Sequence, residues 1–368
     1  MKITRFAQLG AVAAVATLAL AGCASNESNG GSASEEPMES TLSGTIGATG
    51  ASSQTAAQEA WVANFQTANP DVTVNYEPTG SGTGRENFIA GASNFIGSDR
   101  AFKLEEIEEN TFAACADGGS AGIVEIPVYI SPVAVAFNLE GIESLNMTAD
   151  VIAGIFAGQI TNWNDEAIAS LNDGVELPDL AISPVHRSDD SGTTETFTSY
   201  LSAAAPSVWT YEPDGEWPIE GGEAAQGTSQ LVDATRNGNG TIAYADASQV
   251  GGLGTVSIGV GGEFVPYSAE AAAMIVDSSP LQDGRTEGDI VFDIDYATEE
   301  AGVYPIALVS YEIGCVEYED ANVAELVSAY FTYIASPEGQ DAAAENAGSA
   351  PISDSLREQV NAAIALIG

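Results

Sequence analysis

Helix-type and strand-type segments alternate along most of this 368-residue chain. Residues 55–70 repeat apolar side chains at helical spacing and end at Asn-Pro, whereas residues 72–78 alternate as a strand does. Alternation of this kind is typical of α/β proteins, in which helices cover the faces of a sheet. Further expected segments are a pair of apolar strands over 122–138, a helix, turn and helix over 148–172 with Thr148 as N-cap, a strand over 180–187, a helix over 194–205, a helix and strand over 226–247, a strand over 303–314, and helices over 321–336 and 353–366.

The N-terminal residues stand apart from this pattern. Residues 1–22 combine a short basic start with an apolar run that is short for a membrane span, the composition of a secretory signal. The run ends in Leu-Ala-Gly-Cys, which resembles a bacterial lipobox and predicts cleavage before Cys23 and diacylation of that cysteine. A plain signal peptide with a chance cysteine is the alternative. Residues 23–42 are rich in Ser, Gly and Glu and predict a flexible tether, so we expect an extracytoplasmic protein anchored to the cell membrane by its lipid.

Size and cysteine content bound the folded part. Roughly 325 residues follow the tether, more than a single core usually organises, so two lobes are expected. No second long apolar segment follows, and no transmembrane span is expected. Cys115 and Cys315 remain after Cys23, and in an exported protein such a pair suggests a disulfide. Two independent buried thiols are the alternative.

The chain is strongly acidic, with a formal net charge of -44. Nucleic acid and anionic membrane are therefore excluded as partners, apart from contact through the lipid on Cys23. The scattered acids indicate a solvated surface. There is no His/Cys cluster and no calcium-loop spacing, so neither a metal nor another cofactor is expected. The basic residues beyond the signal are Arg85, Arg100, Lys103, Arg187, Arg236, Arg285 and Arg357.

Three turns of Gly, Ser and Thr each lead into a helix: GATGASSQ, PTGSGTGRE and RSDDSGTTETF. A helix N-terminus presents free N–H groups and the positive end of the helix dipole, so it binds anions. Serine and threonine are also common N-caps, and each turn alone could be a simple cap. Three such turns, two of them beside Arg85 and Arg187, favour an anion site.

Asp99, in FIGSDRAF, is an acid close to the expected anion site, and it would repel the anion unless the anion carries a proton. A carboxylate accepts a hydrogen bond from that proton and repels a fully ionised anion. Phosphate keeps a proton at neutral pH and sulfate does not, so Asp99 would select phosphate over sulfate. A capping role, or a pair with Arg100, is the alternative.

These residues, in this order, resemble the phosphate-binding proteins of bacterial ABC phosphate importers, the Pst system. The shared stretches include VNYEPTGSGTG, GQITNWNDEAIASLN, RSDDSGTTETFTSYL and VYPIALVSY, and the resemblance spans nearly the whole mature chain. It implies an α/β type II periplasmic-binding-protein fold with two lobes of mixed sheet and helices, a two-strand hinge and phosphate in the cleft. The expected divisions are 1–22 signal, 23–42 tether, 43–130 and 305–368 the first lobe, and 131–304 the second.

The resemblance also implies a ligand set and partners. Hydroxyl or N–H donors would come from three turns, Arg187 would be the cation, held by Asp189, and Asp99 would accept the ligand's proton. At the first turn Gram-negative members commonly carry Thr-Phe where this chain has Ser52-Ser53. Arg85 is either a second cation at the rim or the partner of a surface acid. The expected protein is a monomer that binds inorganic phosphate and delivers it to ABC permease subunits. The full set is Ser52, Ser53, Ser81, Asp99, Arg187, Ser191, Gly192 and Thr193, supported by Ser98, Asp189 and Arg85, with a disulfide between Cys115 and Cys315 in one lobe.

Several alternatives stay open at this level. A phosphate sensor, or a binder of sulfate or molybdate, would use the same kind of turns. A serine hydrolase built on Ser191 is the rival from another class, but His186 is the only histidine and the G-x-S-x-G elbow is absent. The GSGTGRE turn also lacks the Gly-Lys-Ser/Thr ending of a nucleotide-binding P-loop. We therefore expect a binding protein and not an enzyme.

Overall fold

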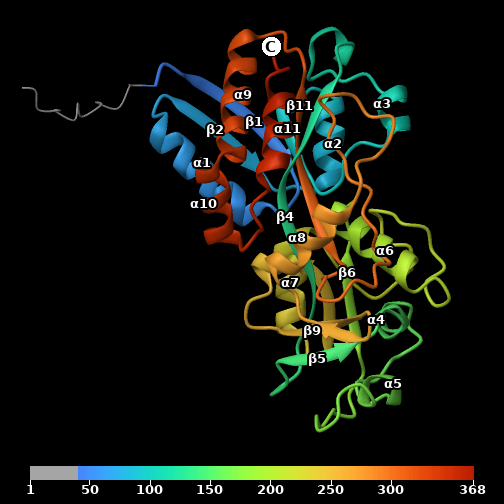
Figure 1. Ribbon diagram of the computed structural model, residues 1–368. Helices are drawn as coiled ribbons and strands as arrows, with labels where there is room; N and C mark the ends of the chain where they lie inside the picture. Colours follow the sequence, from blue (N-terminus) through green and yellow to red (C-terminus); the bar gives the residue numbers. More distant parts are fainter. Residues whose placement is uncertain (1–39) are drawn as a thin grey trace, which may run out of the picture. The chain divides into compact units, whose positions relative to one another are not determined.

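One mixed sheet of eleven strands runs through residues 40–368, the part of the chain that the computed structural model describes (Figure 1). Eight strands follow the order β2-β1-β3-β11-β4-β8-β6-β7, and β9 pairs with β4 and carries β5 and β10. Helices flank the sheet, so the predicted α/β class is confirmed. The strands are β1 (Gly44–Gly50), β2 (Val72–Glu77), β3 (Phe95–Ser98), β4 (Ile123–Phe137), β5 (Ser144–Met147), β6 (Ser183–Arg187), β7 (Glu223–Ala225), β8 (Thr241–Asp246), β9 (Gly254–Val260), β10 (Glu263–Val265) and β11 (Ala307–Cys315).

The helices include the segments expected from the sequence and several that were not. Thr148 is the N-cap of α4, as predicted, and accepts a hydrogen bond from the N–H of Val151. The glycine-rich second turn was expected to lead into a helix, but α2 already begins at Ser81, and the Gly84 N–H bonds the Gly80 carbonyl in the helical pattern. The helices are α1 (Thr55–Ala68), α2 (Ser81–Ile89), α3 (Leu104–Glu109), α4 (Ala149–Phe156), α5 (Glu166–Ala169), α6 (Gly192–Ala204), α7 (Gly227–Asn237), α8 (Ala269–Ser278), α9 (Ala321–Ala335), α10 (Pro337–Ala347) and α11 (Asp354–Ile364), with 3₁₀ turns η1 (Ala116–Gly119) and η2 (Ala247–Gln249).

The N-terminal strands bring two of the predicted turns to one sheet edge. β1 pairs in parallel with both β2 and β3, and Gly50 lies opposite Gly97. Because parallel strands end at the same edge, the turns after β1 and β2 and the residues after β3 lie close together. The C-terminal helices (red in Figure 1) cover this part, with α9 against β1 and α10 against α1.

The expected pair of strands over 122–138 is a single strand, β4, buried along its whole length. A proline within a strand commonly interrupts its pairing, because a proline cannot donate to its neighbour. The register with β11 shifts there, so that Pro127 faces Tyr311 and Tyr129 faces Ser310. This bulge accommodates Pro127 without ending the strand.

β4 changes neighbours along its length. Its first part pairs antiparallel with β11 as far as Pro132, and Val133 onward pairs with β8 and β9. β6 runs parallel to β8, and a short loop over residues 188–191 connects β6 to α6. The lobe boundaries predicted at 130/131 and 304/305 lie near this change of partners and stay a prediction.

The disulfide between Cys115 and Cys315 is present, as predicted. It joins the segment after α3 to the end of β11, two positions separated by 200 residues. Both cysteines lie in the main hydrophobic core.

The leader lies outside the described residues. The signal at 1–22, Cys23 and most of the 23–42 tether are therefore not seen, although Leu42, at the end of the tether, packs against the core. Among residues 40–368, no helix combines the length and apolar character that a membrane crossing requires.

Asp246 is a buried acid where β8 meets β4. Its Oδ1 accepts hydrogen bonds from the Tyr129 hydroxyl at 3.0 Å and from the Ser248 N–H at 3.0 Å, whereas its Oδ2 has no partner. Burial raises the pKa of Asp246 to about 6, although the bonds from Ser248 and Tyr129 oppose this change. As the pH rises, Asp246 therefore loses its proton first in the unfolded chain and keeps it to a higher pH in the folded chain.

Removing the disulfide tests how much the long connection stabilises the fold. We expect the double variant Cys115→Ala, Cys315→Ala to lose about 2–5 kcal/mol of unfolding free energy, because the cross-link restricts the unfolded chain. Urea unfolding followed by circular dichroism measures this. The wild-type protein in reductant is the control and should match the variant; equal midpoints for the variant and the oxidised wild type would contradict the expectation.

Asp246 predicts a pH-dependent part of the stability. A carboxyl whose pKa is raised on folding stabilises the fold below its unfolded pKa of about 3.8, and this contribution is lost as pH rises toward 6. Between pH 4 and pH 7 we expect the unfolding free energy of the wild type to fall relative to Asp246→Asn by on the order of 2 kcal/mol. Urea titrations at each pH measure the difference, and parallel curves would rule out the raised pKa.

Candidate functional site

The Asp99 carboxylate, directly after β3, gathers three hydroxyl groups from distant parts of the chain. Ser53 Oγ donates to Asp99 Oδ1 at 2.6 Å, and Ser310 Oγ on β11 donates to the same oxygen at 2.7 Å. Thr193 Oγ1 in the first turn of α6 donates to Oδ2 at 2.7 Å. All four side chains are buried. Hydrogen bonds to a carboxylate are charge-assisted, so these contacts are among the stronger ones in the fold.

The first turns of α2 and α6 meet at Asp99. The Asp99 N–H donates to Ser81 Oγ at 3.1 Å. A Cβ on Gly192 would lie 2.6 Å from Asp99 Cβ and 3.0 Å from Ser81 Oγ. Only glycine therefore allows the start of α6 to approach this closely. Two helix N-termini, each with the positive end of a dipole, thus lie beside the same carboxylate.

The capping alternative holds for one of the three turns. Ser191 is the N-cap of α6 and accepts a hydrogen bond from the Thr194 N–H at 3.2 Å. The N-cap positions of α1 and α2 make no side-chain cap. The Ser53 hydroxyl goes to Asp99, and Ser81 Oγ accepts from the Asp99 N–H, so simple capping does not explain these two serines.

Arg187 ends β6 with its guanidinium against Asp189. Arg187 Nε lies 2.8 Å from Asp189 Oδ1, and the Gly227 N–H donates to the same oxygen at 3.1 Å. Arg187 is 3% exposed, and its own N–H donates to the hydroxyl of Tyr244. The guanidinium of Arg187 is therefore buried, and Asp189 fixes its orientation, which is the role that the resemblance implies for Asp189.

Arg85 pairs with a surface acid, as one of the two alternatives predicts, although its own side chain is buried. Its Nη2 lies 2.9 Å from Asp190 Oδ2, and its Nη1 donates to Ser98 Oγ at 3.1 Å. Burial, together with the nearby Arg100, lowers the pKa of Arg85, and Asp190 opposes that change. Arg85 thus links α2 and β3 to the loop before α6.

Ser52 contacts Thr228, a residue that the sequence analysis did not single out. Ser52 Oγ lies 3.0 Å from Thr228 Oγ1 and accepts the Thr228 N–H at 3.1 Å, and Gln249 donates to the Ser52 carbonyl at 3.0 Å. Thr228 belongs to a fourth turn of the same composition, Gln-Gly-Thr-Ser, at the start of α7. That composition was a signal which could have identified it. Ser310 had none, since it lies within an apolar strand segment.

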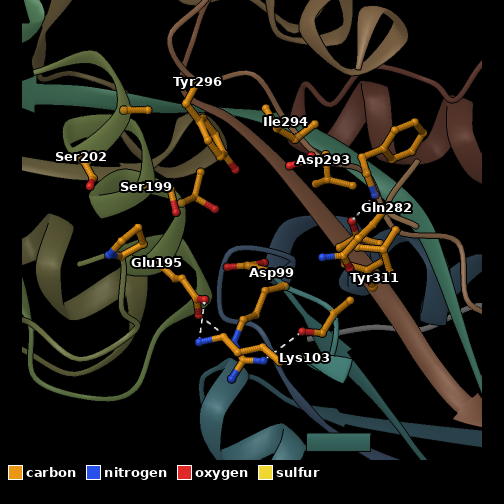
Figure 2. A pocket seen from close by; sticks show the side chains of 18 of the residues that line it. Asp99, Lys103, Glu195, Ser199, Ser202, Gln282, Asp293, Ile294, Tyr296 and Tyr311 are labelled. Atoms are coloured by element: carbon orange, nitrogen blue, oxygen red, sulfur yellow. Dashed lines mark hydrogen bonds and ion pairs between the residues drawn. The ribbon is translucent and has the colours of Figure 1, made fainter. Parts of the chain in front are cut away.

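An open cleft of about 590 Å³ borders this cluster, with Asp99 at its edge (Figure 2). Glu195, in the first turn of α6, lines this cleft and forms an ion pair with Lys103. Arg100 Nε lies 2.7 Å from Glu195 Oε2, and Lys103 Nζ lies 3.4 Å from Oε1. These ion pairs join the segment after β3 to α6, and the Arg85–Asp190 pair joins α2 to the loop before α6.

The hydrolase alternative fails on geometry. His186 Nδ1 lies 2.9 Å from the Arg187 carbonyl and Nε2 lies 3.0 Å from that of Gly221, so neither ring nitrogen is directed at Ser191 as a base. The ring stacks on Trp217. Ser191 Oγ is the cap of α6. Within residues 40–368 no group of acids, histidines or cysteines could hold a metal ion.

Comparison with known proteins identifies the family. The PBP superfamily domain matches residues 35–338. Phosphate-binding protein PstS 3 of Mycobacterium tuberculosis is 32% identical over 326 residues, covering 87% of this chain and 86% of that protein. The chain belongs to the PstS family. PstS 3 of Mycobacterium leprae is 34% identical over the same length and covers the same shares.

Solved structures agree with the PstS assignment at the level of the fold. A high-affinity periplasmic phosphate-binding protein, PfluDING, solved with bound phosphate, matches with a TM-score of 0.67 at 20% identity, covering 86% of this chain and 93% of that one. The expected resemblance to the phosphate-binding proteins and the periplasmic-binding-protein fold are thus confirmed. The relatives of this PstS-family chain are named as binding proteins, in agreement with the expectation that it is not an enzyme.

Proposed function

We propose that this chain is an extracytoplasmic phosphate-binding protein that delivers inorganic phosphate to an ABC permease. The observation that carries the proposal is the buried Asp99 carboxylate, an acceptor set between two helix N-termini and three hydroxyl groups. Such a site suits an anion that still carries a proton, since the acceptor needs a donor on the ligand. The names of the PstS relatives support the same ligand.

The proposed ligands combine neutral donors with one cation. Backbone N–H groups at the starts of α1, α2 and α6 would surround the phosphate, and Arg187 would provide the charge-assisted contact. Asp189 orients Arg187 and offsets part of its charge. Several hydrogen bonds of about 1.5–3 kcal/mol each suffice for micromolar or tighter binding without net positive charge. The proposed ligand set is Ser52, Ser53, Ser81, Asp99, Arg187, Ser191, Gly192 and Thr193.

Binding would be coupled to closure of two lobes, 43–130 with 305–368 against 131–304. The contacts that support this idea connect the two sets of residues directly: Thr193 to Asp99, Asp190 to Arg85, and Glu195 to Arg100. Closing over phosphate would present one defined shape to the permease. An exported, lipid-anchored protein, with acylation at Cys23 and residues 1–22 removed, completes the proposal.

Phosphate titration by calorimetry tests the ligand. The mature protein should bind phosphate with micromolar or tighter affinity in the presence of excess sulfate. Arg187→Ala should weaken binding roughly 100-fold, because it removes a charge-assisted bond and leaves Asp189 unopposed beside the anion. Arg236→Ala is the matched control: this half-exposed arginine pairs with Asp233 on α7 and should leave affinity unchanged. Absence of binding, or full displacement by sulfate, would refute the proposal.

Asp99→Asn tests how the anion is selected. The amide can donate to a fully ionised anion, so sulfate should gain affinity relative to phosphate by roughly tenfold or more. Competition titrations with the two anions measure the ratio of their dissociation constants. Asp233→Asn, on the exposed face of α7, is the control for loss of one negative charge. An unchanged ratio in Asp99→Asn would show that the Asp99 carboxylate does not select the anion through the proton that the anion carries.

A further inference from the structure

We propose that Ser310, oriented by Gln54, is a positioning residue that determines which oxygen of Asp99 receives the ligand's proton. The inference rests on the proposed phosphate function and adds to it two residues that lie outside the proposed ligand set. It follows from a chain of buried hydrogen bonds that begins at Glu312 and ends at Asp99. Gln58, Gln54 and Ser310 lie between them, in that order.

The orientation of the Gln54 amide is fixed by a carbonyl group. Gln54 Nε2 lies 3.3 Å from the Tyr311 carbonyl oxygen and 2.8 Å from Ser310 Oγ. A carbonyl oxygen only accepts, so the amide nitrogen, and not the amide oxygen, must face this side. Gln54 Oε1 then faces Gln58 Nε2, which donates to it at 2.9 Å. The Gln54 amide therefore donates to Ser310.

Gln58 holds the other end of the chain in place. Its amide nitrogen also donates to Glu312 Oε1 at 2.7 Å, and its amide oxygen accepts from the Tyr330 hydroxyl at 2.9 Å. Glu312 and Tyr330 are fully buried. A flip of either amide would break several of these bonds at once, and both amides are buried, at 0% and 2% exposed. The Gln54 amide is also closely packed, since a Cβ on Gly97 would lie 2.6 Å from Gln54 Oε1.

The direction of the Ser310 hydroxyl follows from the amide. Ser310 Oγ receives the Gln54 N–H, so its own proton is free to point elsewhere. Its other partner is Asp99 Oδ1, at 2.7 Å, and the hydroxyl donates there. Ser53 donates to the same oxygen at 2.6 Å. A carboxylate oxygen has two lone pairs, so Oδ1 is fully occupied.

Asp99 Oδ2 is the oxygen left for the ligand. Within the described chain it accepts one bond, from Thr193 Oγ1, so one lone pair remains. That oxygen lies on the α6 side, where the Gly192 backbone passes close to Asp99. The P–OH of a protonated phosphate is therefore received at Oδ2. Ser310 keeps Oδ1 from competing for that proton and keeps the carboxylate from rotating.

The test measures selectivity, because a purely structural role would weaken both anions alike. The quantity is the dissociation constant for sulfate divided by that for phosphate, from competition calorimetry. Ser310→Ala should lower this ratio roughly tenfold, mainly through weaker phosphate binding, since a bond to a charged group is lost. Ser310→Thr keeps the hydroxyl and should restore the ratio to within about threefold of wild type.

Two further variants complete the design. Gln54→Met keeps the length of the side chain but removes the donor, so Ser310 can turn and the ratio should fall in the same direction as in Ser310→Ala. Ser131→Ala is the matched control, because Ser131 is a buried serine on the adjacent strand β4 whose hydroxyl contacts the Pro132 carbonyl and Asp246 rather than Asp99. Its ratio should equal that of wild type. Thermal unfolding of each variant checks that it folds.

The outcomes separate this inference from the proposed function. A wild-type protein that binds no phosphate would refute the function, and the inference with it. A selective wild type, with ratios unchanged in both Ser310→Ala and Gln54→Met, would overturn the inference alone. A lower ratio in Gln54→Met, with Ser131→Ala unchanged, would support it even if Ser310→Ala failed to fold.

Discussion

The structure depends on one carboxylate that is buried where four segments meet. Asp99 is bonded to hydroxyl groups 46, 94 and 211 positions away in the chain, from the turn before α1, from α6 and from β11. An unpaired charge in such a place would cost several kcal/mol, so the three donors are needed to keep it there. Satisfying Asp99 therefore places the segments that carry the proposed anion ligands.

This dependence explains how a chain of net charge -44 can hold an anion site. Attraction by net charge is not available, and the overall field slows the approach of an anion. Inside the site, helix N-termini and hydroxyl groups act over a few ångströms among buried side chains, where dipoles are more effective than in bulk water. The buried cations are each matched by an acid, Arg187 by Asp189 and Arg85 by Asp190. The site thus relies on the orientation of its dipoles and hydroxyl groups rather than on excess positive charge.

The sequence predicted the parts of the site whose chemistry is local. Ser53, Ser81 and Thr193 lie in short turns whose composition alone indicates helix starts, and Asp99 was conspicuous as an acid near them. Thr228 lies in a fourth turn of the same composition, so its sequence carried a usable signal. Ser310 could not be found in this way, because it lies in an apolar strand segment and reaches the site only through a contact 211 positions long in the chain. The same limit made β4 look like two strands, since the bulge opposite Ser310 that accommodates Pro127 exists only in the paired sheet.

The two oxygens of Asp99 differ in what closure can change. Ser53 and Ser310 belong to the same proposed lobe as Asp99, so the bonds on Oδ1 would persist when the lobes separate. Thr193 belongs to the other proposed lobe, and its bond to Oδ2 would form only when α6 comes near. Oδ1 is then a fixed support, set by Gln54 and β11, and Oδ2 is the oxygen at which ligand and closing lobe meet. Proton recognition and closure would therefore act on one atom, and an anion without a proton would leave that atom facing like charge just as the cleft closes.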